Sequence, residues 1–361
     1  MRSPFVPGAP APTFFAPAIG GNPAYAFDSV AGRHVLLLFM GSTALPAMQA
    51  ALDRLLASRA LFDDHRACFF GVTADPADVD QGRVRQLIPG IRFFDDRALA
   101  VSRLYRAVGD GPGVPYRPFW LLLDERLRVV AEAPLDRTDA IIALLERRLA
   151  TPPLEMHAPV LIVPEVLDRA TCTDLIARYD AAGGQPSGFM RTEDGKTVLR
   201  HDSSFKRRQD HIIEDEPLRE HLSRRIRHAL LPQIEAAFQF RVTRIERWLI
   251  ACYDAAEGGF FGAHRDNKSP GTAHRRFACT INLNADDYDG GDLRFPEFGM
   301  RTYRAPTGGA VIFSCSLLHE ATPVIRGRRY AFLPFFYDDA AAEIRRANNA
   351  LLGEGVSAYT G

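Results

Sequence analysis

The chain has 361 residues, 47% of them hydrophobic, and its 44 basic side chains balance 44 acidic ones. This composition predicts a globular protein long enough for two domains with separate cores. The neutral balance argues against nucleic-acid binding, and no apolar run reaches the roughly 18 residues of a membrane span. No secretory signal is visible, and five scattered cysteines without a Cys-x-x-Cys pair favour reduced thiols in a cytoplasmic protein.

The first 150 residues alternate strand and helix patterns. Strands are predicted at 34–40 and 68–75 and in a hairpin formed by 118–124 and 126–133; helices are predicted at 44–62, 97–108 and 138–149. Thr138 is the expected N-cap of the last helix. The order βαβα followed by ββα is typical of a thioredoxin-like α/β domain, which we place at residues 1–150.

A Pro-rich break at 150–159 is the expected linker between two domains. It is followed by a predicted helix at 163–184 that ends at Gly183-Gly184, and by a second one at 216–238 that Pro232 should kink or split. We assign residues 151–242 to this linker and to helices that support the next domain.

From residue 243 to about 340 the pattern changes to short strands between Gly and Pro turns. The predicted strands lie within 244–254, 277–284, 290–297, 309–316 and 328–338. Such a series fits an antiparallel double sheet, the jelly roll or double-stranded β-helix. The expected fold is therefore multidomain, α/β followed by β with flanking helices, and residues 341–361 form a C-terminal tail.

His264-Arg265-Asp266 matches the catalytic-loop motif of protein kinases, but the rest of the chain does not fit a kinase. A kinase has Asn five residues after this Asp, where the chain has Gly271. There is no Gly-rich loop on a first strand and no Val-Ala-Ile-Lys, and the chain contains only three lysines. A kinase function is therefore excluded.

The same stretch can instead hold a metal ion. On an extended strand, residues i and i+2 share a face, so His264 and Asp266 would point inward and Arg265 outward. His319, 53 residues after Asp266, would complete a set of two imidazoles and one carboxylate. This set is typical of non-haem Fe(II) oxygenases with open coordination positions, although it could also hold a catalytic zinc ion.

A cosubstrate anchor would distinguish iron from zinc. Iron of this type binds 2-oxoglutarate, whose distal 5-carboxylate needs a buried cation, and Arg suits this role better than Lys. Arg329 lies ten residues after His319 on the next predicted strand. The sequence therefore favours the iron interpretation.

The segment 243–337 resembles the Fe(II)/2-oxoglutarate-dependent dioxygenases of the prolyl 4-hydroxylase type. The resemblance rests on "YDAAEGGFFGAHRD", "INLNADDYDGGDLRFPE", "PTGGAVIFSCSLLHEATPV" and "GRRYAFLPFF". It implies His264, Asp266 and His319 as iron ligands, Arg329 as the 5-carboxylate anchor and Tyr253 as a hydroxyl contact of 2-oxoglutarate. The family usually has Arg-x-Ser at the anchor; Ala331 replaces the Ser here, and Arg328 lies beside the anchor.

The resemblance also implies an activity: hydroxylation of a prolyl, peptide or amino-acid C–H bond with Fe(2+), 2-oxoglutarate and O₂, releasing succinate and CO₂. Ascorbate is an optional reductant. The substrate is then a small molecule, a peptide or a protein, which the sequence does not identify, and neither nucleic acid nor membrane is an expected partner. The alternative is a non-catalytic 2-oxoglutarate or oxygen sensor or adaptor.

The first 150 residues resemble the peroxiredoxins, on "APAPTFFAPAI", "RPFWLLLDERLRVV" and the order of elements. A peroxidatic Cys belongs in the first turn of the helix after the first core strand, where the helix dipole lowers its pKa. The corresponding stretch 41–50 has no Cys, and Cys68 begins a later strand. We therefore expect a non-catalytic domain, with a scaffold role or a protein partner.

Several polar or sulfur-containing side chains remain open to interpretation. The stretch 203–211, "SSFKRRQDH", is expected to be a solvated loop or a salt-bridged collar, with a substrate-binding lip as the alternative. His274 is expected at the surface or in a supporting role and not as a ligand. Asn282 and Asn284 could face the pocket, and Cys252, Cys279 and Cys315 are expected to pack as small apolar side chains.

Overall fold

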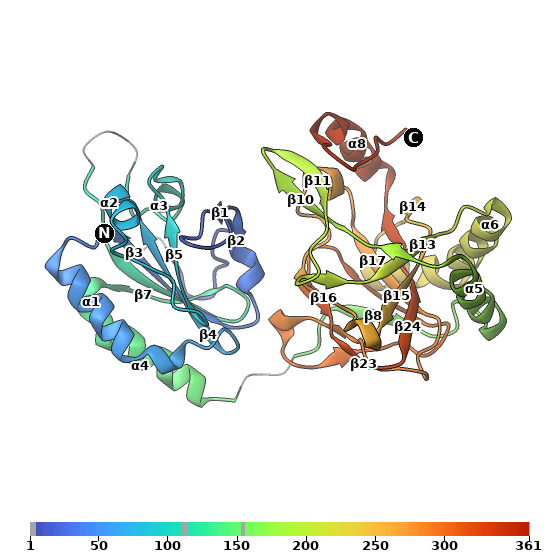
Figure 1. Ribbon diagram of the computed structural model, residues 1–361, viewed down its shortest axis with the longest axis horizontal. Coiled ribbons are helices and arrows are strands. Elements are labelled where there is room, and N and C mark those ends of the chain that lie inside the picture. Colours follow the sequence, from blue (N-terminus) through green and yellow to red (C-terminus); the bar gives the residue numbers. More distant parts are fainter. Residues whose placement is uncertain (1–4, 110, 112–113, 153–155, 361) are drawn as a thin grey trace. The chain divides into compact units, whose positions relative to one another are not determined.

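The computed structural model describes residues 5–109, 111, 114–152 and 156–360. The chain divides into two compact units (Figure 1): Met1–Met156 with Pro296–Gly299, and His157–Phe295 with Met300–Gly361. Of the expected linker 150–159, residues 153–155 lie outside the described part. Within the described residues, no helix has the length and apolar character needed to cross a membrane.

A five-stranded sheet forms the centre of the first unit, with strand order β5-β4-β3-β6-β7. Its strands are β3 (His34–Gly41), β4 (Ala67–Thr73), β5 (Ile91–Asp95), β6 (Phe119–Leu123) and β7 (Val129–Pro134). β3, β4 and β5 run parallel, whereas β6 and β7 are antiparallel additions at β3. Both faces of this sheet are covered, which explains the continuous apolar runs of its central strands. The topology is thioredoxin-like, as predicted.

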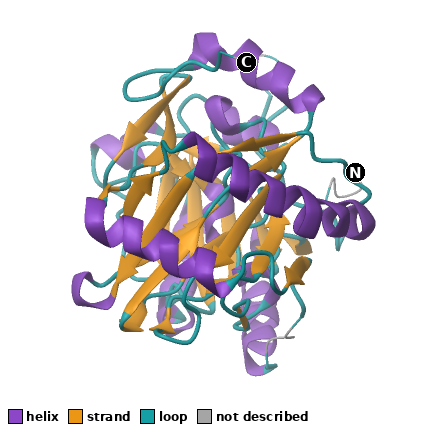
Figure 2. Ribbon diagram, turned by 90° about the vertical axis from the view of Figure 1, so that its right-hand side faces the viewer, coloured by secondary structure: helices purple, strands orange, loops and turns teal. Residues whose placement is uncertain are grey.

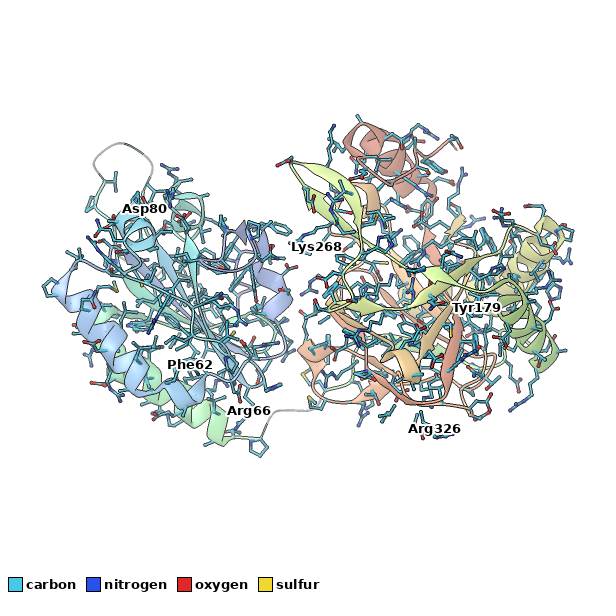
Figure 3. The ribbon with its side chains drawn as sticks, in the orientation of Figure 1. Phe62, Arg66, Asp80, Tyr179, Lys268 and Arg326 are labelled. Carbon is cyan, nitrogen blue, oxygen red and sulfur yellow. The ribbon has the colours of Figure 1, made fainter. Side chains whose placement is uncertain are left out.

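Helices and aromatic side chains cover the two faces of this sheet. α1 (Pro46–Ala57) and α4 (Thr138–Ala150) lie side by side on one face (Figure 1) and pack on Leu36, Phe69 and Trp120. Phe62, labelled in Figure 3, belongs to the same core. On the other face, Phe14 and Phe27 from the N-terminal segment stack near Phe70 and Phe94. The remaining elements are β1 (Phe15–Ala16), β2 (Tyr25–Ala26), α2 (Pro76–Asp80) and α3 (Ala100–Leu104).

Three details of the first unit differ from expectation. The edge strand β5 was not predicted, and the helix expected at 97–108 is only the five-residue α3. Thr138 is not the N-cap of α4 but its first residue, after Arg137. Its hydroxyl donates to the Leu135 carbonyl (2.8 Å) and accepts from the Trp120 indole (2.9 Å). The Thr138 hydroxyl therefore binds Trp120 of β6 and the Leu135 carbonyl, and does not cap the helix.

Two antiparallel sheets face each other in the second unit. The larger has the order β14-β25-β17-β24-β15-β13-β9, with β21 pairing to β17 and to β8; the smaller has the order β12-β16-β22-β19-β20. Leu249, Ala251 and Tyr253 of the larger sheet pack towards Phe261 and Ala321 of the smaller one. This arrangement is the predicted jelly roll.

The strands of the larger sheet are β8 (Val160–Val163), β9 (Gln185–Pro186), β13 (Gln209–Ile212), β14 (Arg244–Glu246), β15 (Leu249–Asp254), β17 (Phe277–Asn282), β21 (Ala310–Ser314), β24 (Arg328–Phe332) and β25 (Phe335–Tyr337). Those of the smaller sheet are β12 (Lys206–Arg207), β16 (Phe260–His264), β19 (Leu293–Arg294), β20 (Thr302–Tyr303) and β22 (His319–Ala321). Two further pairs are β10 (Phe189–Glu193) with β11 (Lys196–Arg200), and β18 (Asp289–Gly290) with β23 (Val324–Arg326).

Helices cover the outer face of the larger sheet: α5 (Arg169–Ala182), α6 (Glu216–Arg225) and α7 (Leu231–Phe238). Figure 2 shows helices lying across these strands, and Figure 3 labels Tyr179 of α5, which packs on Tyr330 of β24. α5 ends at Gly183 with φ +74°, as predicted. The second helix is divided just before Pro232, as predicted. A π-helical turn, Ile226–Leu230, joins α6 to α7, and Pro232 lies in the first turn of α7, where its missing N–H is tolerated.

Most of the segment expected to be a C-terminal tail is structured. α8 (Asp339–Ala347) begins after Asp338, whose carboxylate accepts from the Ala341 N–H. Ala341 and Ala342 are buried against Tyr337, and Tyr359 packs on the same cluster. The C-terminal segment therefore contributes to the second unit and positions one wall of the cavity described below.

Candidate metal centre and cosubstrate site

The pairing of β16 with β22 brings two histidines together. Their register places His264 directly opposite His319, after an irregularity between Phe261 and His264. Asp266 follows in the turn after β16, where its N–H donates to the Cys315 carbonyl (3.0 Å). Ligand atoms of His264, Asp266 and His319 lie within 4.8 Å of one another. The strand ends at His264, two residues earlier than the extended interpretation required, but the turn brings the carboxylate to the same point.

Backbone carbonyls orient both imidazoles. Nδ1 of His264 lies 2.8 Å from the Gly262 carbonyl, and Nδ1 of His319 lies 3.0 Å from the Leu317 carbonyl. A carbonyl accepts only, so each Nδ1 carries the proton and each Nε2 presents its lone pair. The two Nε2 atoms lie 3.5 and 3.3 Å from the Asp266 oxygens. Such oriented ligands are typical of metal-binding histidines.

The protonation states also suit a metal ion. Burial, followed by the neighbouring His264, lowers the pKa of His319 to about 4, so its imidazole is neutral at pH 7. Burial opposes ionisation of Asp266, but His319 and His264 hold the pKa of its carboxyl below the usual value. A neutral imidazole beside a carboxylate is the form in which these side chains bind metals.

Aromatic side chains line the ligand set. The Phe261 ring stacks on the His264 ring with centroids 3.7 Å apart, and Phe313 lies 4.5 Å from His319. The side chains of His264 and Asp266 remain 15% and 12% exposed. The centre is therefore enclosed but can be reached from solvent.

Arg329 enters the barrel beside this centre. On paired strands β24 and β15 it lies opposite Tyr253, and its guanidinium lies 5.0 Å from the centre of the Tyr253 ring. Arg329 is 2% exposed, and its Nε has no hydrogen-bond partner in the described part of the chain. Arg328 instead faces outward and pairs with Asp254 (2.8 Å). Arg329, and not Arg328, is therefore the buried cation free to bind a carboxylate.

The space around Arg329 is suited to a small polar molecule. Tyr253 and Tyr288 are both buried, and the Tyr288 hydroxyl has no partner among the described residues. The backbone at Gly291, at φ +67°, approaches these side chains closely: a Cβ would lie 2.8 Å from Val324 and 3.1 Å from the Arg329 side chain. Unpaired buried donors of this kind fit 2-oxoglutarate, whose oxygens would satisfy them. Ala331, on the same strand, supplies no hydroxyl.

The stretch 203–211 forms an ion-paired collar, and not a solvated loop. Arg208 donates from Nε and Nη2 to the two Asp210 oxygens, both at 2.7 Å, and both residues are largely buried. Arg208 Nη1 also lies 3.4 Å from the Tyr253 hydroxyl. The buried Lys206 ammonium donates to the Ser187 hydroxyl (2.7 Å) and lies over the Phe261 ring. The sequence analysis did not place these residues in the barrel. Their spacing was a signal, because Lys206, Arg208 and Asp210 occupy every second position, as residues on one face of a strand do.

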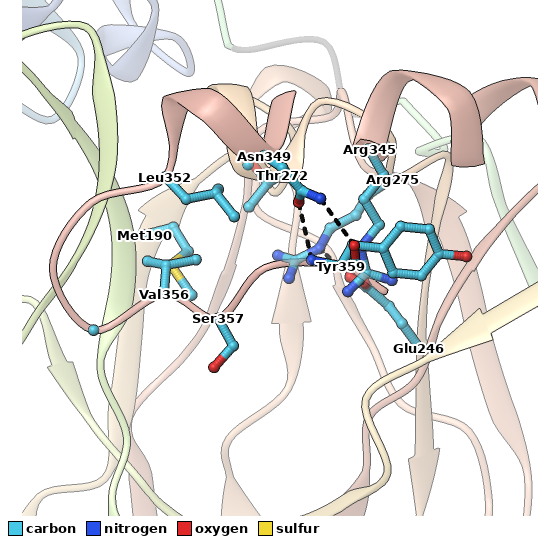
Figure 4. Close-up of a pocket in the computed structure, with 12 residues that line it drawn as sticks. Met190, Glu246, Thr272, Arg275, Arg345, Asn349, Leu352, Val356, Ser357 and Tyr359 are labelled. Atoms are coloured by element: carbon cyan, nitrogen blue, oxygen red, sulfur yellow. Dashed lines mark hydrogen bonds and ion pairs between the residues drawn. The ribbon is translucent and has the colours of Figure 1, made fainter. Parts of the chain in front are cut away.

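His274 is neither a ligand nor at the surface. It is 1% exposed at its side chain, and its Nε2 lies 2.9 Å from Glu246. The buried Glu246 carboxylate also pairs with Arg275 (2.6 Å) and Arg345 (2.8 Å). Figure 4 shows Glu246 and both arginines on the wall of a cavity of about 160 Å³, with Tyr359 of the C-terminal segment beside them.

The remaining candidates have structural roles. The Asn282 amide donates to the Ala305 carbonyl (2.7 Å), but its buried Oδ1 lacks a partner among described residues. Asn284 hydrogen-bonds to the backbone of β24. All five cysteines are free and buried, and burial raises the pKa of Cys68 to about 12. The prediction that the cysteines pack as apolar side chains is therefore confirmed.

Residues 248–337 match the 2OG-Fe(II) oxygenase superfamily. A PKHD-type hydroxylase of Synechococcus sp. (strain JA-2-3B'a(2-13)) is 33% identical over 118 residues, which are 30% of this chain and 52% of that protein. The chain thus spans about half the length of this curated relative. Among solved structures, a Pseudomonas putida prolyl-4-hydroxylase covers 54% of this chain and 98% of its own (21% identity, TM-score 0.38). Xanthomonas campestris peroxiredoxin Q covers 39% of this chain and 99% of its own (18% identity, TM-score 0.32).

Proposed function

We propose that the chain is an Fe(II)- and 2-oxoglutarate-dependent dioxygenase that hydroxylates a C–H bond. In the balanced reaction, the substrate C–H, 2-oxoglutarate and O₂ yield the C–OH product, succinate and CO₂. The observation that carries this proposal is the convergence of His264, Asp266 and His319 in a domain that also holds a buried Arg329, whose Nε has no partner among the described residues. A zinc hydrolase would use the three ligands alone, with no role for such an arginine.

Each of these side chains has a defined task in the proposal. His264, Asp266 and His319 hold the iron on one face, which leaves adjacent positions open. Arg329 binds the 5-carboxylate of 2-oxoglutarate, and the hydroxyls of Tyr253 and Tyr288 are available to its oxygens. Iron with its cosubstrate supplies the oxidation of the C–H bond, while the chain positions the reactants and limits the access of water.

The test is succinate formation from 2-oxoglutarate by protein purified without oxygen, reloaded with Fe(II) and then given O₂. Asp266→Ala removes the only carboxylate of the ligand set, so iron-dependent succinate should fall to background. Asp174→Ala, at an exposed position of α5, is the matched control and should keep full turnover. Undiminished turnover in the Asp266 variant would rule out this ligand assignment.

For the first unit, we propose a scaffold or partner-binding role, in a protein located in the cytoplasm. Its one cysteine, Cys68, is buried in β4 with a raised pKa, whereas a peroxidatic thiol must be exposed and acidic. Five free cysteines suit a reducing compartment. Iron and 2-oxoglutarate binding without any succinate formation would favour the sensor or adaptor alternative.

A further inference from the structure

Arg247 is a cation of the second unit. Among the described residues, no acceptor lies within hydrogen-bond distance of its guanidinium. It lies between β14 and β15, and its side chain is 26% exposed. The nearest carboxylate oxygen, Oδ2 of Asp210, is 3.7 Å away, which is too far for a hydrogen bond. That carboxylate already accepts two hydrogen bonds from Arg208. Among the described residues, the Arg247 guanidinium therefore donates no hydrogen bond.

The position of Arg247 relates it to the metal centre. Its guanidinium and that of Arg275 both lie over the Phe335 ring, at 5.1 and 4.1 Å from the ring centre. Both arginines are close enough to Asp266 for their charges to interact with its carboxylate. A ligand held by Arg247 would therefore lie within electrostatic reach of Asp266.

Two features indicate that Arg247 is held in place at the expense of stability. Its backbone has φ +66°, in the left-handed region that residues other than glycine seldom adopt and that is common at functional sites. Burial, together with the like charges of Arg208 and Arg275, lowers its pKa to about 10. The guanidinium still carries its charge at neutral pH, so an anion at this point would relieve both the desolvation and the repulsion.

Four other basic side chains near the centre already have a partner or a role. The pairings are Arg208 with Asp210, Arg275 with Glu246, Lys206 with the Ser187 hydroxyl, and Arg329 with 2-oxoglutarate under the proposed function. Among these five side chains, Arg247 has the weakest compensation, a 3.7 Å approach to an Asp210 carboxylate that Arg208 already engages. Its planar fork matches the two coplanar oxygens of a single carboxylate.

We propose that Arg247 binds the carboxylate of the substrate, so that the molecule hydroxylated is a free amino acid or a similar small carboxylic acid. Inside a peptide chain, only an Asp or Glu side chain would offer such a group. This inference rests on the proposed function and deepens it, because it names the substrate class.

A binding experiment tests the anchor without knowledge of the substrate. The anaerobic Fe(II) protein, saturated with 2-oxoglutarate to occupy Arg329, is melted in acetate or in chloride of equal ionic strength. Acetate should raise the Tm of the wild type above its value in chloride, and Arg247→Gln should lose this increment. Arg224→Gln, an exposed position of α6, should keep it. No acetate increment in the wild type, or an equal one in Arg247→Gln, would overturn the assignment.

The same experiment separates the two proposals. A Tm increase on addition of 2-oxoglutarate alone reports the proposed function, and it should be equal in the wild type and in Arg247→Gln. Without added anions, Arg247→Gln should melt no lower than the wild type, because glutamine removes the repulsion and the desolvated charge. A merely structural arginine would instead give a lower Tm.

A turnover experiment then tests the substrate class. The twenty free amino acids, each paired with its carboxamide, and one peptide with internal prolyl residues are compared for stimulation of 2-oxoglutarate consumption. At least one free acid should stimulate turnover, and its carboxamide should not. Arg247→Gln should raise the KM of that acid about 10- to 100-fold. Stimulation by the peptide alone, equal stimulation by acid and amide, or no stimulation by any acid would overturn the inference.

Discussion

Replacing Arg329 by Met should weaken 2-oxoglutarate binding and at the same time stabilise the protein without ligand. Arg329 is 2% exposed and its Nε has no partner among the described residues, so the folded protein without cosubstrate contains a poorly compensated buried cation. Methionine fills a similar volume without the charge. The two effects have opposite signs, which distinguishes a ligand anchor from a structural arginine.

The magnitudes follow from this burial. Loss of one partner of a buried charge pair costs roughly 2–4 kcal/mol of binding, or about 30- to 900-fold in Kd. Removing an unsatisfied buried donor returns about 1–3 kcal/mol of stability, which raises the Tm of a unit of this size by a few degrees. At 2-oxoglutarate concentrations about 100 times the wild-type Kd, the wild type gains about 2.7 kcal/mol and the variant less than about 1 kcal/mol.

Calorimetric titration of the anaerobic Fe(II) protein measures the Kd, and thermal melts with and without 2-oxoglutarate measure the two stabilities. Arg328→Met is the matched control, because Arg328 is 57% exposed and pairs on the outer face. It should keep the wild-type Kd. If the Arg329 variant melted lower than the wild type without ligand and bound 2-oxoglutarate equally well, the anchor assignment would be refuted.

Two further predictions concern groups outside the cosubstrate site. Glu246→Gln should destabilise the second unit by about 2–4 kcal/mol in urea unfolding at pH 7, because Arg275 and Arg345 lose their shared carboxylate. Burial opposes ionisation of Glu246, but Arg275 and His274 hold the pKa of its carboxyl in the folded protein far below normal. The wild type should therefore exceed the variant in free energy of unfolding by the full amount above the unfolded pKa of about 4.3, and by less as the pH falls below it. An advantage independent of pH between 7 and 3 would contradict this account. Cys68→Ala should leave peroxide consumption unchanged, and native Cys68 should resist thiol reagents at pH 7, because burial raises its pKa to about 12; a loss of peroxide reduction in this variant would restore a redox role.

The sequence predicted those parts of the fold whose apolar patterns are set by nearby residues. The runs that became β3, β4 and β6 were recognisable because each is continuously buried, and the end of α5 because Gly183 takes a positive φ. β8 and β5 were missed: each is a short edge strand that depends on a distant neighbour for its hydrogen bonds. Thr138 was expected to cap its own helix, but a tryptophan from another strand uses its hydroxyl.

For the candidate site, spacing in the sequence selected the residues that the fold brings together at the ligand set. His264, Asp266 and His319 converge because two strands pair in one register, and their separation in the sequence is typical of that pairing. Arg247 and Arg208 could not be identified in the same way. Their significance depends on which charges lack a partner, and that depends on the distances between strands that are far apart in the chain.

The backbone contacts around the ligand set have a consequence for iron supply. The two histidines face each other across hydrogen-bonded strands, carbonyls hold both rings, and the Asp266 N–H is tied to Cys315. The chain therefore needs no metal to assemble its ligands, and binding loses little free energy to ordering. An ion that enters the site therefore meets donor atoms that the chain itself already orients.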